Sequence, residues 1–370
     1  MKPIVLLVFL SVLFSLLTSC TKEDKEEEER EAGPKRTILV YIGRDNNLNG
    51  KFENKRDSII KGWNGKGGHL VIYQDLPEGS TFEVIHKEKG EAIATLVYEK
   101  AEDNSASAEV FERVIKETVA ECPADSYGLI LFSHATGWLP DDSFQALRSI
   151  VRDQDAWMNL PDFANAIPDK QFEFIVFEAC LMAGIEVAYE LKDKSNYILA
   201  SPAEVLSPGF RDIYPASINK LFLPDADLAS FTNDIYEYQK ELYFSSVTLS
   251  LIRTSALPKL AEWVRKYANP VDYPAIEGIQ VFDRKGRHVF FDFEQHFSRL
   301  TDNEAARSEL AALLEECLVC KYHTPSFLLS NQGFKITHYS GLTTYIAQES
   351  FPYLNEAYKD MQWTQAISKK

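Results

Sequence analysis

Residues 172–191, FEFIVFEACLMAGIEVAYEL, place two hydrophobic patterns one after the other. Phe172–Phe177 is apolar or aromatic almost throughout, which is typical of a strand buried on both faces of a sheet. Met182–Leu191 follows with apolar residues at helical spacing. A buried strand that leads into a helix is half of a strand–helix–strand unit, so this stretch predicts a parallel α/β sheet.

The same kind of strand recurs in the first part of the chain. An antiparallel hairpin is expected beside the second strand, because polar and apolar residues alternate there, and an amphipathic helix precedes the third. The strands are expected at Thr37–Gly43, His69–Gln74, Tyr127–Phe132 and Tyr197–Ala200, the hairpin at Phe82–His86 and Ala92–Tyr98, and the helix at Ser107–Glu121. These elements predict a three-layer α/β/α sandwich with a mostly parallel sheet over residues 37–222.

The pattern after residue 222 is less regular. Helices are expected at Leu228–Leu242, Ala256–Tyr267 and Glu304–Cys320, and strands at Ser246–Ile252, Thr324–Leu329 and Leu342–Ala347. We expect residues 223–370 to form a C-terminal α/β extension packed on the core, although the pattern also fits a separate domain.

The N-terminal segment, MKPIVLLVFLSVLFSLLTSC, has the features of an export signal. Lys2 precedes the apolar run Ile4–Leu17, which is too short to span a bilayer comfortably. Leu17-Thr18-Ser19-Cys20 looks like a bacterial lipoprotein box, which predicts a signal peptide over residues 1–19 and lipidation of Cys20. A plain signal peptide that happens to contain a cysteine is the alternative. Lipidation would anchor the protein in the bacterial cell envelope, at the outer membrane, on the periplasmic or the surface side.

An acidic tether follows the lipidated cysteine. Residues 20–36 contain no apolar stretch that could fold alone, so the segment is either a solvated surface-export signal or a simple linker. The whole chain has 55 acidic and 39 basic residues among 370, for a formal charge of −16. This balance is poorly suited to phosphate backbones, so we expect no nucleic-acid partner. Hydrophobic residues make up 45% of the chain, which excludes a wholly disordered protein.

Two strands end in side chains that are suited to catalysis. One continues into Ser133-His134-Ala135 and the other into Glu178-Ala179-Cys180. If the strands are neighbours, His134 and Cys180 meet at the carboxyl edge of the sheet, where α/β proteins place their reactive groups. The helix expected after Cys180 would favour its thiolate, and a nearby histidine can protonate a leaving amine. Packing alone also explains a buried cysteine and a histidine, so the spacing leaves both interpretations open.

The residues around these strand ends resemble the clostripain (C11) family of cysteine peptidases, in the caspase/gingipain clan. The first similar segment is SHATGW at 133–138, against the family pattern Ser/Asp-His-Gly-x-Gly-Trp. The second runs from Phe177 to Leu191 and resembles Asp-x-Cys-x-Met followed by a helix, with Glu178 in place of the Asp. Weaker similarity covers 197–204, 207–210 and 340–345, so the resemblance extends over about residues 37–365 in the same order. It implies a caspase-like fold.

The resemblance also implies roles for individual residues. Cys180 is the expected nucleophile, His134 its partner, and cleavage is expected after Arg or Lys with no cofactor required for the chemistry. The family places an acid two positions before the nucleophile at the base of the pocket for the basic side chain, and Glu178 holds that position here, one methylene longer than the usual Asp. The alternative is that Glu178 caps the following helix. Ala135 replaces a usual Gly near the substrate, which matters if that position needs a positive φ.

The polar segment between Leu139 and Leu160 suggests maturation. Members of the family are often cut at a basic residue in such a loop, so Arg148 and Arg152 are possible self-cleavage sites. Asp153 and Asp155 give a weak indication of calcium, which normally takes six to eight oxygen ligands. Cys317-x-x-Cys320 with His323 lacks the further ligands of a zinc site, so we expect core packing or a local disulfide there.

These features predict an envelope-anchored cysteine endopeptidase that acts on peptides or proteins after Arg or Lys by a Cys180–His134 dyad. The alternative is a catalytically inactive lipoprotein that keeps the peptidase fold in order to bind peptide or glycan. Ala135 and Glu178 are the departures from the family pattern that leave room for the alternative.

Overall fold

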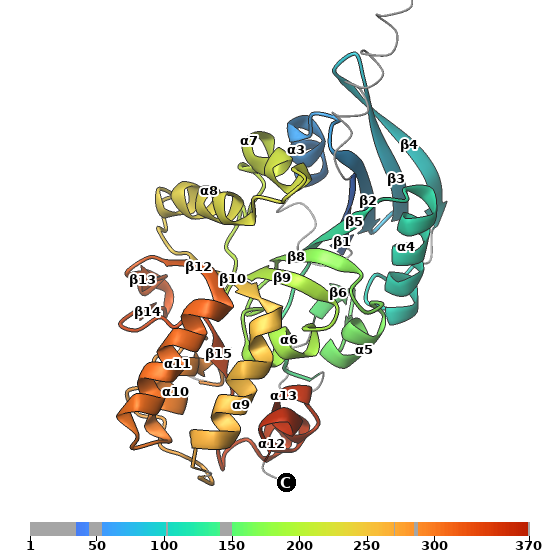
Figure 1. Cartoon of the computed structure of the whole chain (residues 1–370). Helices are drawn as coiled ribbons and strands as arrows, with labels where there is room; N and C mark the ends of the chain where they lie inside the picture. The colour runs from blue at the N-terminus through green and yellow to red at the C-terminus, as the bar shows by residue number, and fades with distance from the viewer. Residues whose placement is uncertain are drawn as a thin grey trace, which may run out of the picture.

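A single nine-stranded sheet organises the computed structural model, which describes residues 35–43, 54–100, 103–140, 150–269, 271–284 and 288–368. The strand order is β12-β10-β9-β8-β5-β1-β2-β3-β4, and the sheet runs through the middle of the molecule (Figure 1). The strands are β1 (Arg36–Gly43), β2 (Gly68–Leu76), β3 (Gly79–Glu88), β4 (Glu91–Lys100), β5 (Ser126–Phe132), β8 (Phe172–Glu178), β9 (Ser195–Ala200), β10 (Thr248–Arg253) and β12 (Leu318–His323).

The sheet is mostly parallel, as predicted. Its central strands β2, β1, β5, β8 and β9 pair in parallel, and the hairpin β3–β4 continues the sheet antiparallel beside β2. β10 pairs antiparallel with both β9 and β12, so only β3 and β10 run against the common direction in this sheet of the described chain. The near-continuous apolar sequences of the central strands follow from this position, because helices cover both of their faces.

The side chains of β8 show how the two faces are divided. Phe174 and Val176 belong to one hydrophobic core, whereas Ile175 and Phe177 belong to the other. The first core is covered by α3 (Lys55–Gly62), α7 (Tyr214–Ser217) and α8 (Leu228–Lys240). The second is covered by α4 (Ala108–Glu121), α5 (Leu160–Asn165), α6 (Ile185–Glu190), α9 (Leu257–Tyr267), α11 (Glu304–Cys317) and α13 (Gln362–Ile367). The predicted three-layer α/β/α arrangement is therefore confirmed.

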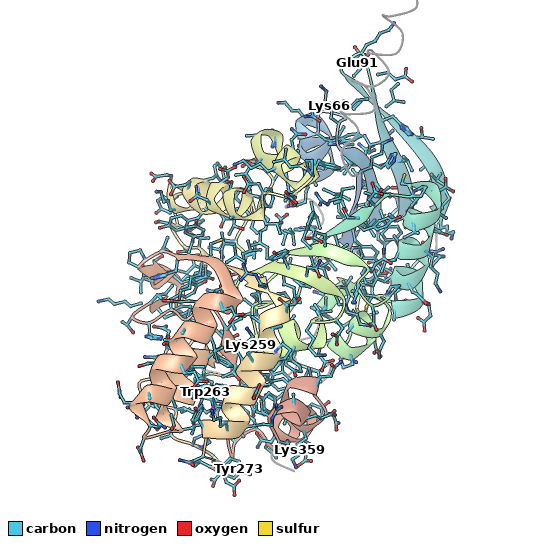
Figure 2. The ribbon with its side chains drawn as sticks, in the orientation of Figure 1. Lys66, Glu91, Lys259, Trp263, Tyr273 and Lys359 are labelled. Atoms are coloured by element: carbon cyan, nitrogen blue, oxygen red, sulfur yellow. The ribbon has the colours of Figure 1, made fainter. Side chains whose placement is uncertain are left out.

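The second half of the chain completes the same sheet. β10 and β12 come from beyond residue 222 and extend the sheet past β9. Helices α9 and α11 pack side by side, and the indole N–H of Trp263 donates to the carbonyl of Ala306 at 2.8 Å (Figure 2). The remaining elements are small: β11 (Phe291–Asp292), α10 (Phe293–Arg299), β13 (Ser326–Phe327), β14 (Phe334–Lys335), β15 (Thr343–Thr344) and α12 (Pro352–Lys359).

Three of the predicted C-terminal elements have the wrong extent. The helix expected to reach Cys320 ends at Cys317, because Leu318–His323 forms the edge strand β12. The strands expected at 324–329 and 342–347 contain only two residues each, in β13 and β15. Both of these pair within small two-stranded sheets outside the main one, and their apolar residues divide between different cores: Phe327 and Leu328 fill a satellite core, whereas Leu342 and Tyr345 pack in the main one.

Within the described residues no helix combines the length and the apolar character that crossing a bilayer requires.

A buried carboxyl group joins α6 to the C-terminal segment. The side chain of Glu186 has no solvent exposure, and its Oε1 accepts hydrogen bonds from the Tyr345 backbone N–H at 2.8 Å and from the Thr344 hydroxyl at 3.1 Å. Burial raises the pKa of Glu186 to about 7, although the bonds from Tyr345 and Thr344 oppose the increase. The folded chain therefore holds this proton more tightly than the unfolded chain does.

Glu186 makes stability depend on pH. Because its pKa is higher in the folded state, its contribution is complete below the ordinary glutamate pKa and is lost as the pH rises through about 7. We expect Glu186→Gln to remove this dependence while keeping the acceptor oxygen. Between pH 5 and pH 8, the free energy of unfolding of the variant should rise relative to the wild type by roughly 2–3 kcal/mol. Urea unfolding at both pH values measures the difference, and a constant difference would contradict the assignment.

Candidate active site

The register between β5 and β8 places His134 and Cys180 at the same edge of the sheet. Phe132 is paired with Glu178 across the two parallel strands, and His134 and Cys180 each follow two residues later. The two strands are therefore neighbours, which is the condition that the sequence-based hypothesis required. Both side chains are half-buried, and they leave the sheet at the carboxyl ends of adjacent strands.

The loops that carry the two residues touch each other. Gly137 has a φ of 65°, and a Cβ atom there would lie 2.7 Å from the carbonyl oxygen of Leu181, the residue after Cys180. Glycine is thus required at this position both for its backbone conformation and for the close approach of the loops. Trp138 continues the turn into the core, where its ring packs 5.0 Å from Tyr345. Contact at Gly137 holds the His134 loop directly against the Cys180 loop.

A short hairpin, β6 (Ile150–Asp153) and β7 (Ala156–Met158), supports the His134 loop. Ile150 forms an antiparallel bridge with Ala135, and the Arg152 backbone N–H donates to the Ser133 hydroxyl at 3.0 Å. Trp157 places its ring centroid 6.4 Å from that of His134. The imidazole is therefore bordered by the hairpin, which comes from a stretch that the sequence predicted only as a polar loop.

Cys180 lies in a strained turn. Leu181 has a φ of 63°, a left-handed conformation that costs a residue with a Cβ free energy and is common at functional sites. The Leu181 backbone N–H donates to the Ala203 carbonyl at 2.9 Å, and the Val205 backbone N–H donates to the Cys180 sulfur at 3.4 Å. The loop that begins after β9 therefore holds both the turn and the thiol.

The predicted helix at Met182–Leu191 is too long. α6 starts at Ile185, because Gly184 before it has an extended backbone (φ −79°, ψ 144°), and the Ala183 backbone N–H donates to the Ser201 carbonyl of the neighbouring loop. Cys180 therefore does not sit at a helix N-terminus, and the expected thiolate stabilisation from that source is wrong. Burial raises the pKa of the Cys180 thiol to about 11, opposed by the bond from Val205.

An ion pair that the sequence did not indicate lies beside Cys180. Arg284 donates to both carboxylate oxygens of Glu204 at 2.5 and 2.6 Å, and its charge opposes the increase in the thiol pKa while Glu204 adds to it. Arg284 also donates to the Asn331 carbonyl at 2.8 Å. The pair connects the loop over Cys180 to the C-terminal part of the chain. Its partners are far apart in sequence, so no local motif could reveal it.

Ala135 keeps an ordinary backbone. It is 5% exposed, forms the bridge to Ile150, and is not among the described residues with positive φ. The left-handed position of this motif is Gly137 instead. Alanine at 135 therefore needs no strained conformation.

The backbone of Ala135 leads to a prediction. We expect Ala135→Gly to change kcat/KM by less than about threefold and to lower the free energy of unfolding by about 0.5–1 kcal/mol, because glycine adds backbone freedom without relieving strain. Peptide hydrolysis and urea unfolding measure both effects. An increase in kcat/KM beyond about tenfold would instead mean that the alanine methyl obstructs the substrate.

Glu178 is enclosed by donors. Its side chain is fully buried and forms an ion pair with the equally buried side chain of Lys55. The Phe210 backbone N–H donates to Oε1 at 2.6 Å and the Tyr214 hydroxyl donates to Oε2 at 2.8 Å. The alternative role of capping the next helix is wrong, because the N-cap of α6 is Gly184 and lacks a side-chain cap. Lys55 was missed because the sequence predicted no helix at its position.

The residues predicted for self-cleavage, lipidation and calcium binding do not form one site in the described part of the chain. Arg148 and Cys20 are outside the described residues. Arg152 lies in β6, half-buried, and donates to the Gln154 carbonyl at 2.7 Å. Asp153 is buried and accepts from the Ser105 backbone N–H at 2.9 Å, whereas Asp155 is almost fully exposed. Among the described residues, no group of three or more His, Cys, Asp or Glu side chains is arranged to hold a metal ion, and the weak expectation of calcium stays a prediction.

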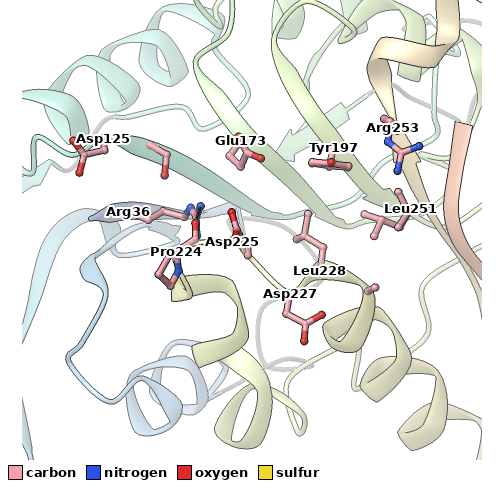
Figure 3. A pocket seen from close by; sticks show the side chains of 14 residues that line it. Arg36, Asp125, Glu173, Tyr197, Pro224, Asp225, Asp227, Leu228, Leu251 and Arg253 are labelled. Atoms are coloured by element: carbon pink, nitrogen blue, oxygen red, sulfur yellow. Dashed lines mark hydrogen bonds between the residues drawn. The ribbon is translucent and has the colours of Figure 1, made fainter. Parts of the chain in front are cut away.

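A cavity of about 540 Å³ lies at the other end of the sheet (Figure 3). Arg36 and Ser126, the first residues of β1 and β5, line it together with Glu173, Asp225 and Arg253. β8 begins beside this cavity at Phe172 and ends at Glu178, two residues before Cys180. The cavity is therefore separated from the thiol by the length of β8, which is about 20 Å. It plays no part in the site described above.

Comparisons with known proteins agree with this fold. The clostripain family of peptidases (Peptidase C11) matches residues 40–321. A solved structure of an inactive zymogen C11 protease from Parabacteroides distasonis is 30% identical and has a TM-score of 0.82, covering 91% of this chain and 99% of its own. A secreted C11 cysteine protease from Bacteroides thetaiotaomicron, solved with an irreversible peptide inhibitor, is 25% identical with a TM-score of 0.80 over 90% of this chain and 99% of its own.

Clostripain from Hathewaya histolytica is 23% identical over 211 residues, which is 47% of this chain and 40% of that protein. The chain thus spans less than half of the curated relative that it matches. The fold and the matched region nevertheless define the class: the chain belongs to the clostripain family of cysteine peptidases.

Proposed function

We propose that this chain is a cysteine endopeptidase in which Cys180 attacks the scissile carbonyl and His134 carries the proton to the leaving amine. The observation that supports this most is the paired exit of the two residues from neighbouring strands, with their loops in contact at Gly137. Family membership adds independent support.

The chemistry follows from the two side chains. The thiol proton passes to the imidazole, the sulfur bonds to the carbonyl carbon, and collapse of the tetrahedral intermediate releases the amine with that proton. Water then hydrolyses the thioester and restores the thiol. In its free form the enzyme has a half-buried thiol whose pKa is raised by desolvation. A protonated His134 beside the sulfur, once substrate excludes water, would offset this because it stabilises the thiolate.

The preferred bonds follow a basic residue. Glu178 precedes Cys180 by two positions on β8 and provides a carboxylate for the guanidinium or ammonium of the substrate. The N-terminal segment anchors the enzyme to the envelope through Cys20. Of the two candidate self-cleavage sites, Arg152 fits this scheme poorly, because proteolysis favours exposed loops and Arg152 is held in a strand.

Fluorogenic peptides that differ only at P1 test this function. The purified full-length protein is incubated with Arg, Lys, norleucine and Asp substrates, before and after prolonged incubation that allows self-cleavage. Separately, iodoacetamide labelling followed by peptide mapping reports whether the Cys180 thiol is reactive. Turnover together with alkylation of Cys180 supports the enzyme. A folded protein that turns over no peptide and leaves Cys180 unlabelled would favour the silent, peptide- or glycan-binding alternative.

A further inference from the structure

The Glu178 carboxylate, which is proposed to bind the basic side chain of the substrate, already forms an ion pair with a lysine of the same chain. Lys55 is the first residue of α3, and its ammonium group forms the ion pair with Glu178 while both side chains are fully buried. The ammonium also lies 4.4 Å from the centroid of the Phe132 ring and 5.6 Å from that of Tyr214. An acid and two aromatic rings around an aliphatic amine form the kind of environment that binds a cationic side chain.

This environment lies close enough to Cys180 to be its specificity pocket. Glu178 is the last residue of β8 and Cys180 follows two residues later in the turn, so their Cα atoms can lie at most about 7 Å apart, a distance that a lysine or arginine side chain can bridge from an acyl carbon on the sulfur. Phe132, which borders the ammonium of Lys55, is the last residue of β5, the strand that leads to His134. It is paired with Glu178 of β8. One loop also contacts both groups, because Val205 donates to the Cys180 sulfur and Phe210 donates to Glu178.

The position of Lys55 is unfavourable for α3 itself. A helix N-terminus carries a partial positive charge, so a lysine at its first position is electrostatically disfavoured. α3 also begins after Asn54 in a left-handed conformation, without a side-chain cap. Complete burial of the ammonium adds a desolvation cost that the pair with Glu178 offsets. Neither helix propensity nor surface solvation therefore explains a lysine here, whereas the charge of Glu178 does.

We propose that Lys55 is a built-in competitor for the basic side chain of the substrate, and that it suppresses cleavage after Arg or Lys in the conformation described here. This inference rests on the proposed function, because it takes Glu178 as the residue that receives P1. With Lys55 in place, the carboxylate accepts from an ammonium, a hydroxyl and a backbone amide. An incoming guanidinium must displace the lysine, so the preference for basic over neutral P1 residues is reduced.

Removing the competitor should reveal the preference. We expect Lys55→Ala to raise the ratio of kcat/KM for an Arg substrate to that for a norleucine substrate by at least about tenfold. The ratio is informative because a purely structural defect lowers both rates together. Lys61→Ala, an exposed lysine in the last turn of the same helix, is the matched control and should leave the ratio unchanged. Lys55→Arg keeps the charge and should keep the ratio low.

A second measurement does not depend on turnover. Lys55→Ala leaves a space beside Glu178 that n-butylammonium can fill, so this ion should raise the melting temperature of the variant by several degrees while leaving the wild type and Lys61→Ala unchanged. n-Butanol, which is of similar shape but uncharged, should not reproduce the effect. Combining Glu178→Gln with Lys55→Ala should abolish the stabilisation by n-butylammonium. The double variant also removes the unpaired buried charge of Glu178, in case the single variant folds poorly.

The two hypotheses fail in different ways. If Lys55→Ala is active but its Arg to norleucine ratio equals that of the wild type, the competitor role is overturned and the endopeptidase stands. If no form of the protein turns over a peptide, the proposed function fails. In that case stabilisation by n-butylammonium still supports a cation site at Glu178 that Lys55 fills, and the absence of stabilisation overturns that as well.

Discussion

Cys180→Ala is expected to abolish peptide hydrolysis, with kcat/KM falling by at least about 10³-fold. The sulfur forms the covalent bond of the proposed reaction, and the methyl group of alanine cannot replace it. Little should change in stability, because the thiol is half-buried and its one described hydrogen bond, from Val205, is 3.4 Å long. Initial rates on the preferred fluorogenic peptide, together with circular dichroism of the variant, measure both properties.

Another free cysteine of the chain provides the control. Cys320 lies in the edge strand β12, is also half-buried, and packs against the core on the α3 and α8 face. Cys320→Ala should retain the activity of the wild type within about twofold, since this thiol belongs to a distant strand of the sheet. Loss of activity in both variants would mean that the effect is not specific to Cys180. Activity retained in Cys180→Ala would mean that Cys180 is not the nucleophile.

The central strands were predictable because the sequence of each strand by itself indicates that the strand is buried. β1, β5 and β8 are surrounded on both faces, so their sequences are apolar over consecutive positions and a local window is enough to recognise them. The adjacency of β5 and β8, on which the site depends, was inferred only conditionally, since strand order is set by crossovers and not by local sequence.

The parts of the site that escaped prediction depend on contacts between distant residues. Lys55 pairs with a carboxylate 123 positions away, and α3, which carries the lysine, has too little apolar periodicity to stand out. The start of α6 was misplaced for a related reason. Gly184 is extended, and the Leu181 and Ala183 N–H groups donate to the loop after β9; no local signal records a long-range bond of that kind.

The predicted specificity residue also gives a prediction about the loop that encloses it. Gly209 has a φ of 65°, and a Cβ atom built there would lie 2.0 Å from Oε1 of Glu178. That oxygen cannot move freely, because Lys55 and the Phe210 N–H hold it in place. We therefore expect Gly209→Ala to lower the free energy of unfolding by about 3 kcal/mol or more, by combining backbone strain with disruption of a buried ion pair. Urea unfolding measures the loss.

Gly90→Ala separates the two contributions. Gly90 has a φ of 88° in the turn between β3 and β4, and a Cβ atom there would meet nothing within 4 Å. The variant thus introduces the backbone strain without the collision, at an expected cost of about 1 kcal/mol. If the two alanine variants lost equal stability, strain alone would explain Gly209 and the Glu178 carboxylate would be mobile. A much greater loss at Gly209 means that the carboxylate is fixed, and only a fixed carboxylate makes Lys55 and a substrate compete for one position.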